Sequence, residues 1–270
     1  MRATYRCSRN GSAKHNDRTF NLDKAEHIDQ ELTPHNWNWH CFAKVLPEAS
    51  FAEVEELFYR KRYSASLEAI NSRYIAQYHP ERCKTIKDLL EGPKTCPSET
   101  LLQAGSKDEH PDYHILAQSM KEFMDYLTSW NRENGNHLHI LNFALHVDES
   151  TPHIHMRTCW DYTDKDGNPR LGQEKGLELS GISLPKPEKS VGRYNNRKMT
   201  FDEMVRTKWQ DILKSHGLEI QTKPLPRRKH KGAEEYIDEQ IAKKQSELQR
   251  LDSQVEWTRD LRDKQQERWK

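Results

Sequence analysis

The chain has 270 residues, of which 31% are charged and 34% hydrophobic, with a formal net charge of +1 and a mean hydropathy of −1.07. It holds no run of about 18 apolar residues, the length that a membrane helix needs, and its first residues, MRATYRCSRN, lack the apolar stretch of a signal peptide. Five widely spaced cysteines without a C-x-x-C pair argue against a disulfide framework or a zinc finger. We therefore expect a cytoplasmic protein with one large domain, or one domain and an appendage.

The first half of the chain alternates strand and helix signals. We expect a strand over 2–8, followed by a polar loop, and a second strand over 36–45, where aromatic residues alternate in NWNWHCFAKV. A helix is predicted to begin at Ser50, because Ser50 and Glu53 form a capping box before an apolar run. It should end at the turn formed by residues 79–80.

A variable region precedes the strongest hairpin signal of the chain. Pro111 suits the first position of a helix that ends at Asn134-Gly135. Two strand-like segments follow, over 137–148 and 153–162, joined by the tetrapeptide ESTP. An antiparallel hairpin is therefore predicted here.

The last part of the chain is predicted to be helical. After a loop over 181–199, Thr200 and Glu203 form a second capping box, and Gly217 ends that helix. A basic linker over 223–233 leads to 234–270, which lacks proline and glycine. Apolar residues recur there at heptad-like spacing, at Ile241, Leu248, Leu251 and Val255. We expect a long helix, and we consider a coiled coil.

Three histidines of the predicted hairpin share one face. With 149–152 as the loop, His146 would pair with His155, and residue 148 with His153. Direct cross-strand neighbours have Cβ atoms about 4.5–5.5 Å apart, so the three imidazoles converge, and any even loop length preserves this. A single histidine would be an ordinary polar residue on a solvated hairpin, but three at this spacing favour an open metal site.

A second H-x-H pair lies in the same segment. His137 and His139 occupy odd positions, which face away from His146, and His137 lies about 30 Å from it along an extended strand. Barring a bulge, we interpret this pair as surface or packing.

Two further elements carry polar or aromatic chemistry. His15-Asn16-Asp17-Arg18 offers an imidazole that can act as nucleophile or base beside a guanidinium that can neutralise phosphate. The second element combines His27 with Asn36-Trp37-Asn38-Trp39. Its two indoles could stack bases, but aromatic residues at strand spacing more often pack in a core, and we favour the core interpretation.

Taken together, these motifs resemble those of the MobV (Pre/Mob) plasmid mobilization relaxases, a branch of the HUH endonucleases. The first motif matches at His15, Asn16 and Arg18. The third matches at His146, Asp148, Glu149, Thr151, Pro152, His153 and His155. The resemblance implies an α+β fold, an antiparallel sheet flanked by helices with the metal site on one face. It places the relaxase domain over 1–222, before the linker and the helical extension.

The resemblance also implies a function. The family nicks one DNA strand at a transfer origin, forms a covalent 5′-phosphate link and so initiates mobilization. His146, His153 and His155 would hold Mn²⁺ or Mg²⁺, His15 would be the nucleophile and Arg18 would clamp the phosphate. Either Glu149 or Asp148 would be the acid/base group, and we favour Glu149. The DNA partner would be an origin hairpin or single strand, contacted by Arg2, Arg6, Arg9, Lys14, Trp37, Arg193, Arg197 and Lys198.

Several alternatives stay open. Trp37 stands where the family usually has a tyrosine, so that position cannot supply a nucleophile, and Tyr5 is a competitor to His15. The family's proline shortly after H-x-H is missing. A rolling-circle replication initiator or transposase of the same class, or a non-catalytic DNA-binding protein, would carry similar features. The terminal helix could mediate a homodimer or contact a transfer partner.

Overall fold

The computed structural model describes residues 1–9, 11–25, 27–221, 238, 241–242, 244–255 and 258. The chain divides into two units, Met1–Thr222 and Lys223–Lys270. In the second unit, residues 244–255 are helical, and the expected linker at 223–233 lies outside the described residues. Among the described helices, none combines the length and apolarity that crossing a membrane requires.

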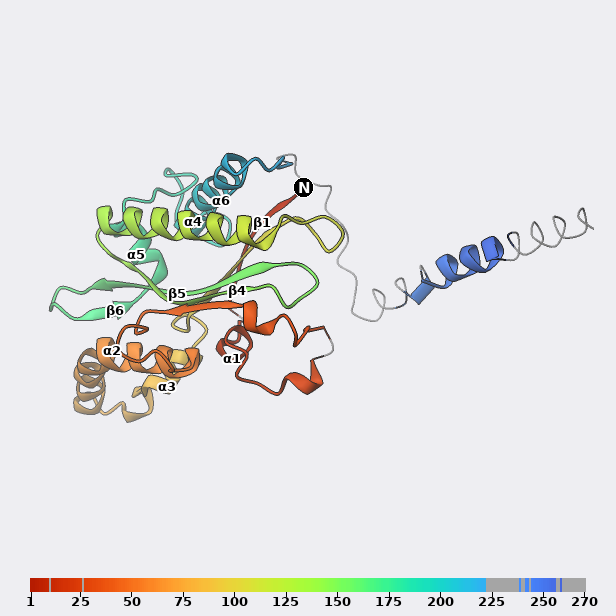
Figure 1. Cartoon of the computed structure of the whole chain (residues 1–270). Helices are drawn as coiled ribbons and strands as arrows, with labels where there is room; N and C mark the ends of the chain where they lie inside the picture. The colour runs from red at the N-terminus through yellow and green to blue at the C-terminus, as the bar shows by residue number, and fades with distance from the viewer. Residues whose placement is uncertain are drawn as a thin grey trace, which may run out of the picture. The chain divides into compact units, whose positions relative to one another are not determined.

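The first unit is built on an antiparallel sheet in the order β1-β3-β5-β4-β2, with β6 paired to β5 (Figure 1). The strands are β1 (Ala3–Ser8), β2 (Trp37–His40), β3 (Ser98–Ala104), β4 (Leu138–His146), β5 (His153–Thr163) and β6 (Pro169–Leu171). Helices cover both faces, so the expected α+β class is confirmed.

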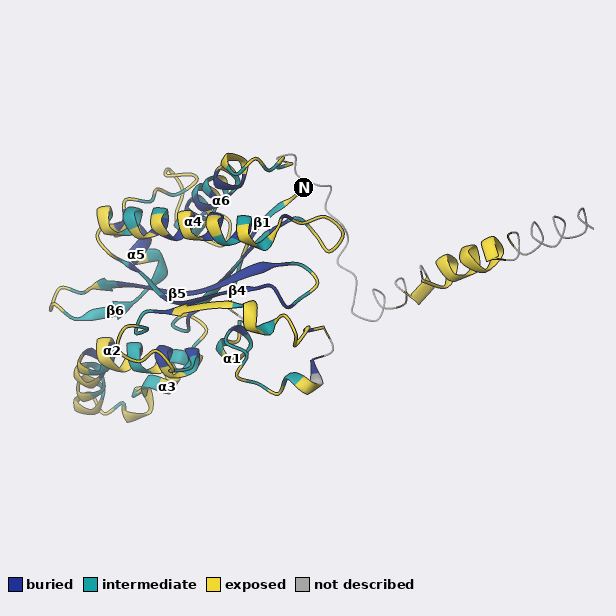
Figure 2. Cartoon of the chain, in the orientation of Figure 1, coloured by how far each residue is buried: buried dark blue, intermediate teal, exposed yellow. Residues whose placement is uncertain are grey.

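The two faces of the sheet carry different helices (Figure 1). One is covered by α4 (Tyr113–Glu133), α5 (Gln173–Leu179) and α6 (Arg197–Ser215), and the other by α1 (Ala13–Asn16), α2 (Phe51–Ala76) and α3 (Ile86–Glu91). The main core lies on the first face, where Phe123 and Trp209 are fully buried. On the second face a smaller core joins Tyr59 and Tyr63 of α2 to Leu141. Figure 2 shows β4 and β5 buried between these layers.

The capping chemistry of the helices agrees with the sequence in one case and differs in two. The capping box at Ser50 is confirmed, since its side chain accepts from Glu53 N–H and the Glu53 carboxylate accepts from Ser50 N–H. The helix predicted from Thr200 begins instead at Arg197, because Asn196 caps it. The helix predicted to have Pro111 at its first position begins at Tyr113, because Asp112 caps it.

The strand predictions need two corrections. β2 ends at His40, and residues 41–45 form turns, so the expected strand over 36–45 is too long. β3 was not predicted, although it separates β1 from β5 in the sheet. Its position matters because it borders the strand that carries His153 and His155.

The register of the β4–β5 hairpin differs from the prediction by two residues. His146 pairs with His153, and Ala144 pairs with His155. The connection is therefore longer than the expected 149–152 and spans 147–152. Because the shift is even, all three histidines still lie on the same face.

A bulge in β4 overturns the predicted orientation of His139. Ile140 pairs with Thr158 while Asn142 pairs with the next residue of β5, so Leu141 is the additional residue. A bulge reverses the side-chain alternation beyond it. His139 therefore faces α2, where its ring packs against Phe58 at 5.3 Å between centroids. The packing interpretation holds, although the face was wrong.

Candidate active site

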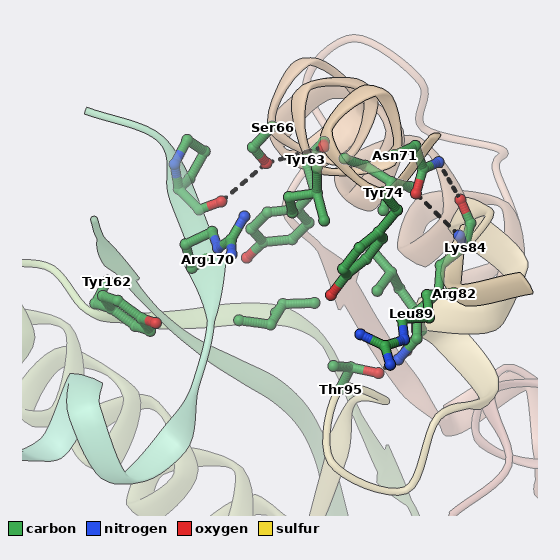
Figure 3. Close-up of a pocket in the computed structure, with 14 residues that line it drawn as sticks. Tyr63, Ser66, Asn71, Tyr74, Arg82, Lys84, Leu89, Thr95, Tyr162 and Arg170 are labelled. Atoms are coloured by element: carbon green, nitrogen blue, oxygen red, sulfur yellow. Dashed lines mark hydrogen bonds between the residues drawn. The ribbon is translucent and has the colours of Figure 1, made fainter. Parts of the chain in front are cut away.

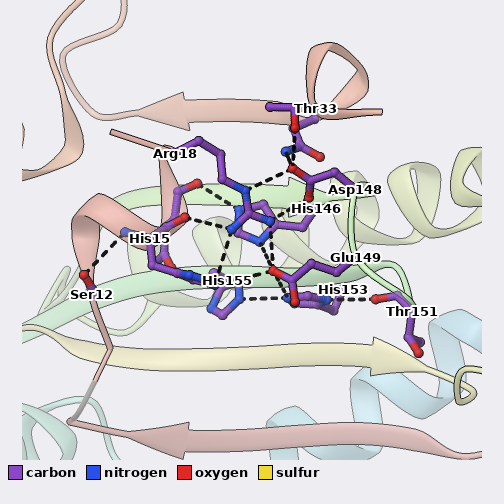
Figure 4. Close-up of polar contacts among 12 residues, drawn as sticks. Ser12, His15, Arg18, Thr33, His146, Asp148, Glu149, Thr151, His153 and His155 are labelled. Atoms are coloured by element: carbon purple, nitrogen blue, oxygen red, sulfur yellow. Dashed lines mark hydrogen bonds and ion pairs between the residues drawn. The ribbon is translucent and has the colours of Figure 1, made fainter. Parts of the chain in front are cut away.

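The three hairpin histidines form one cluster on the α1/α2 face of the sheet (Figure 4). Their ring centroids lie 5.3 Å apart for His146 and His153, 4.9 Å for His146 and His155, and 4.8 Å for His153 and His155. All three are more than nine-tenths buried.

One nitrogen of each ring is already bonded to an acceptor. His146 Nε2 lies 2.9 Å from the Asn16 carbonyl, and His153 Nδ1 lies 2.8 Å from the Thr151 carbonyl. His155 Nδ1 lies 3.0 Å from Glu99 Oε1. Because carbonyls and carboxylates only accept, each of these nitrogens carries the hydrogen. The lone pairs are thus on His146 Nδ1 and on Nε2 of the other two rings.

Those lone pairs point toward one another. The Nε2 atoms of His153 and His155 are 2.9 Å apart, and His146 Nδ1 is buried with no hydrogen-bond partner. Burial lowers the pKa of His146 to about 2. Burial, followed by the neighbouring His155, also lowers the pKa of His153. Neutral imidazoles fixed in this tautomer by outer hydrogen bonds are the arrangement typical of metal ligands.

His15 reaches the same cluster from α1. Ser12 caps this short helix by accepting from His15 N–H. The His15 ring lies 5.4 Å from that of His155 and 5.6 Å from that of His146, between centroids. Burial and the charge of Arg18 lower its pKa, which keeps the ring neutral. The polar loop predicted from sequence therefore ends beside the three histidines.

Glu149 is the carboxylate nearest the imidazoles. Its Oε1 lies 3.5 Å from His15 Nε2, 3.8 Å from His146 Nδ1 and 4.0 Å from His153 Nε2. Its side chain is 19% exposed. Burial alone would raise the pKa of Glu149, but the adjacent His153 imidazole and the hydrogen bond and charge of Arg18 hold it below its usual value. Donor atoms of His146, Glu149 and His153 lie within 4.8 Å of one another, as do those of His15, His146 and His155.

Asp148 has a different position. Its fully buried carboxylate accepts hydrogen bonds from Arg18 Nε and Nη2, from Thr33 Oγ1 at 3.0 Å and from Asn36 Nδ2 at 2.7 Å. These donors offset burial and keep the pKa of Asp148 low. The carboxylate holds three chain segments together, which leaves Glu149 as the acid/base candidate beside His15.

Arg18 is enclosed by carboxylates. Its Nη2 donates to Asp148 at 2.6 Å and to Glu149 at 2.8 Å, and its Nη1 donates to the His15 carbonyl at 3.1 Å. Its backbone is in the left-handed region, with φ of 58°, which non-glycine residues rarely adopt. Because its charge is shared between two carboxylates, the structure places Arg18 as a support for Glu149 and the His15 loop.

Glu99 on β3 is a site residue that the sequence analysis missed. Besides His155 Nδ1, it accepts from Asn16 Nδ2 at 2.9 Å and lies 3.8 Å from Arg157. The side chains of Arg157 and Glu55 form a buried ion pair behind it. Alternation in SETLLQA was the available signal for β3, and it would have placed Glu99 on the face that carries the histidines.

Tyr5 lies on the opposite face of the sheet from His15. Its ring belongs to the main core, and its hydroxyl donates to Asp202 of α6 at 2.8 Å. Burial, followed by the neighbouring Cys7 and Asp202, raises its pKa well above the usual value. Tyr5 therefore cannot compete with His15 at this site.

The basic residues predicted to bind DNA are distributed over both faces. Arg2, Arg6, Lys14 and Arg193 are exposed. Others are engaged within the protein: Arg9 donates to the Pro93 carbonyl, Arg197 pairs with Glu174 and Glu178, and Lys198 pairs with Asp202. These basic residues do not form one groove. His27, which is exposed, lies outside the histidine cluster.

The tryptophans of β2 are exposed, so the expected core packing is wrong. Trp37 is 45% exposed and Trp39 37%. Both contact Phe143 of β4, Trp39 by stacking at 5.1 Å between centroids and Trp37 edge-on at 6.0 Å. They lie on the edge strand of the sheet, on the face of their register partners Leu145 and Phe143 and away from the histidine cluster. Two indoles therefore form an open aromatic surface.

Comparison with known proteins identifies the fold. No protein-family model matches the sequence, and no curated protein does. A solved structure described as the MobM relaxase domain (MOBV; Mob_Pre) bound to plasmid pMV158 oriT DNA, Mn-bound at pH 6.8, matches at 14% identity and a TM-score of 0.50, covering 88% of this chain and 98% of that one. Two further structures of that domain, at pH 5.5 and 4.6, give TM-scores of 0.48 and 0.49 at 15% and 14% identity, over 88% of this chain and 99% and 100% of theirs. The chain therefore has the fold of the MobM relaxase domain, in line with the resemblance of its motifs.

Proposed function

We propose that this chain is a metal-dependent DNA relaxase. It would nick one strand at a transfer origin, transfer the strand through a covalent link to the 5′ phosphate and so initiate mobilization of a plasmid or other mobile element in the bacterial cytoplasm. The observation that carries the proposal is the cluster of three imidazoles with inward lone pairs, next to His15. The similar MobM domain is Mn-bound and bound to oriT DNA, which supports both the metal and the substrate.

The donor set fits a divalent cation. His146, His153 and His155 would hold Mn²⁺ or Mg²⁺, and three imidazoles favour Mn²⁺, because Mg²⁺ prefers oxygen ligands. When bound, the cation polarises the scissile phosphate and stabilises the charge that develops during displacement. Glu99 and the Asn16 and Thr151 carbonyls orient the three rings.

His15 would be the nucleophile. A neutral ring nitrogen of His15 attacks phosphorus, the bond from nitrogen to phosphorus forms, and the bond from phosphorus to O3′ breaks. The leaving O3′ takes a proton from water and becomes a 3′ hydroxyl, while His15 carries the 5′ phosphate as a phosphoramidate. Glu149, 3.5 Å away, stabilises the positive charge that the imidazole gains.

The DNA strand would contact exposed groups near this face. Arg6 alternates with Tyr5 on β1 and so lies on the face of the histidine cluster, and Lys14 neighbours His15 on α1. Trp37 directly follows Asn36, whose side chain bonds Asp148. Both indoles lie on the opposite face of the sheet, with their register partners Leu145 and Phe143, so the strand would reach them around the β2 edge. Base stacking on tryptophan tolerates any sequence and suits single-stranded DNA.

Relaxation of a supercoiled plasmid that carries the origin tests the proposal. We expect relaxation with Mn²⁺, none with EDTA, and none for His15→Ala. Relaxation by the wild type in EDTA and by His15→Ala in Mn²⁺ would refute the mechanism.

Further measurements separate the alternative functions. DNA binding without relaxation would indicate a non-catalytic protein. The position of the cut, beside a replication gene or beside a transfer origin, separates a replication initiator from a relaxase. An acid-labile, alkali-stable protein–DNA adduct would identify histidine as the nucleophile.

A further inference from the structure

A pocket lies at the opposite end of β5 from the histidine cluster (Figure 3). Its volume is about 270 Å³, and it is bounded by the second half of α2, the segment leading into α3, and the β5–β6 hairpin. Tyr162, which lines it, follows His153 by nine residues, or about 30 Å of extended strand. The pocket is therefore separate from the proposed metal site.

The lining of the pocket is basic and aromatic. It includes Arg82, Lys84 and Arg170, together with Tyr63 and Tyr74, and no acidic residue. Tyr162 also borders the pocket, but its ring packs against Gly172 on the other side of the hairpin. In Figure 3 the side chain of Arg82 lies beside Tyr74 and that of Arg170 lies beside Tyr63. A site of this composition favours an anion that also has a flat ring.

Hydrogen bonds fix the walls of the pocket. The Asn71 side chain donates to the Lys84 carbonyl at 2.8 Å and accepts from the Lys84 N–H at 3.0 Å, which ties the segment before α3 to α2. Ser66 Oγ donates to the Pro169 carbonyl at 2.9 Å, which ties β6 to the same helix. The pocket is preformed, so a ligand would not bear the cost of ordering its walls.

The polar groups at the surface of the pocket have unused capacity. Among the described residues, the Tyr74 hydroxyl forms no hydrogen bond, and the Lys84 ammonium forms no ion pair within 4.0 Å. Arg82 and Arg170 form ion pairs through Nε, with Glu81 at 3.7 Å and Asp164 at 3.8 Å, and these pairs do not engage their terminal Nη groups. These donors remain available to a phosphate.

We propose that this pocket binds a single nucleotide, with its base against the Tyr74 ring and its phosphate on the arginines and Lys84. The volume is slightly below the roughly 300–1,000 Å³ of pockets for drug-sized ligands, which fits one nucleotide and excludes a duplex. The nucleotide is either free or an unpaired unit of bound DNA. The second source rests on the proposed function, because the strand would extend from the cut site to the far end of β5.

Calorimetry with free nucleotides tests the pocket by itself. The probes are dTMP and dAMP, with thymidine and inorganic phosphate for comparison, in EDTA so that no nicking occurs. We expect the mononucleotides to bind more tightly than thymidine or inorganic phosphate does. Arg82→Glu with Lys84→Glu, and separately Tyr74→Ala, should weaken binding by roughly tenfold or more, because charge-assisted bonds or ring contacts are lost. Lys87→Glu, an exposed charge reversal on α3 outside the pocket, should leave binding unchanged.

A second arm identifies the source of the nucleotide. We compare two single strands, a long one that extends beyond the cut site and a short one that ends near it. Each is bound to the wild-type chain and to the variant with Arg82→Glu and Lys84→Glu. If the variant binds the long strand more weakly but the short strand as well as the wild type does, the pocket binds a unit of the DNA. If the variant loses mononucleotide binding but binds both strands like the wild type, the pocket binds free nucleotide. No effect in either arm would overturn the proposal. The first arm needs no catalysis, so absence of nicking would count against the proposed function and not against the pocket.

Discussion

The guanidinium of Arg18 forms two hydrogen bonds to the Asp148 carboxylate, at 3.0 Å from Nε and 2.6 Å from Nη2. The two residues are 130 positions apart, and their side chains are 5% and 0% exposed. This pair fixes the loop that carries His15 to the hairpin that carries the three histidines. It therefore determines whether the proposed nucleophile faces the proposed metal site.

Breaking this pair should destabilise the fold. In Asp148→Ala, Arg18 keeps only Glu149 as an ionic partner, and removal of one partner of a buried pair costs about 3–5 kcal/mol. Urea unfolding would measure the loss. Asp125→Ala, which removes the exposed partner of Lys121, is the matched control and should change stability little. Equal losses for the two variants would contradict the structural role given to Asp148.

Glu99→Gln should weaken metal binding without unfolding the protein. The amide can still accept from His155 Nδ1, but it lacks the negative charge that strengthens this hydrogen bond when the ring binds a cation. Loss of such an outer partner typically lowers metal affinity by about 10–100-fold. Titration with Mn²⁺, followed by electron paramagnetic resonance, would measure it. Glu109→Gln, an exposed carboxylate, is the control, and equal affinities for the two variants would show that Glu99 does not act through His155.

The indole surface gives a prediction about DNA. Trp37→Ala with Trp39→Ala should weaken binding of single-stranded DNA, since a base stacked on an aromatic ring contributes about 1–3 kcal/mol. Fluorescence anisotropy in EDTA would measure it independently of nicking. Tyr78→Ala removes an aromatic side chain that is 92% exposed at the end of α2 and should have no effect. If both variants bind like the wild type, DNA does not use β2.

Asp161 should make stability depend on pH. Burial would raise the pKa of Asp161, but the His139 imidazole, 2.9 Å away, and the Arg62 guanidinium lower it overall. A carboxyl with a depressed folded pKa stabilises the fold above its unfolded pKa of about 3.9, and this contribution is lost as the pH falls through the folded value. Asp161→Asn should therefore be less stable than the wild type at neutral pH.

The difference should narrow on acidification. Urea unfolding between about pH 7 and pH 2 should show the two curves converging at the acid end. Asp166→Asn alters an exposed carboxylate of the same hairpin, and its free energy of unfolding should change with pH in parallel with that of the wild type. A constant gap between wild type and Asp161→Asn would contradict the assigned pKa shift.

Local patterns predicted the parts of the site that depend on side-chain parity. His146, His153 and His155 share a face for any even register shift, so the prediction survived an error of two residues. His139 did not, because the bulge at Leu141 leaves no recognisable signal in the sequence and reverses the parity beyond it. A period of two is informative only within one uninterrupted strand.

Contacts between distant segments were less accessible to sequence reasoning. The resemblance implied that Arg18 clamps phosphate, but nothing local shows that Asp148 and Glu149 enclose it. Glu99 was missed because its strand was not predicted, and its pairing with β5 is a tertiary property. The tryptophans were assigned to the core because their alternation fits a strand, but whether that strand lies at an edge depends on the complete sheet order.

The C-terminal helix gives the last prediction, which concerns assembly. Within residues 241–255, the apolar side chains Ile241, Leu248, Leu251 and Val255 are 45–59% exposed. Their spacings of seven, three and four residues place them on one stripe of a helix, and such a stripe is buried when two helices pair as a coiled coil. We therefore expect the full chain to form a dimer through this helix, although a transfer partner could occupy the same stripe.

Sedimentation equilibrium would test this expectation on the full chain. Leu248→Glu with Leu251→Glu places like charges along the stripe and should convert a dimer to a monomer, since unpaired buried charges are strongly unfavourable. Gln249→Glu with Arg250→Glu changes charge on neighbouring exposed positions and should leave the mass unchanged. A monomeric wild type would contradict self-association, and in that case the stripe remains open to a different protein. If the wild type is a dimer and the monomeric Leu248→Glu, Leu251→Glu variant still relaxes the plasmid, the site in the first unit acts without a second copy.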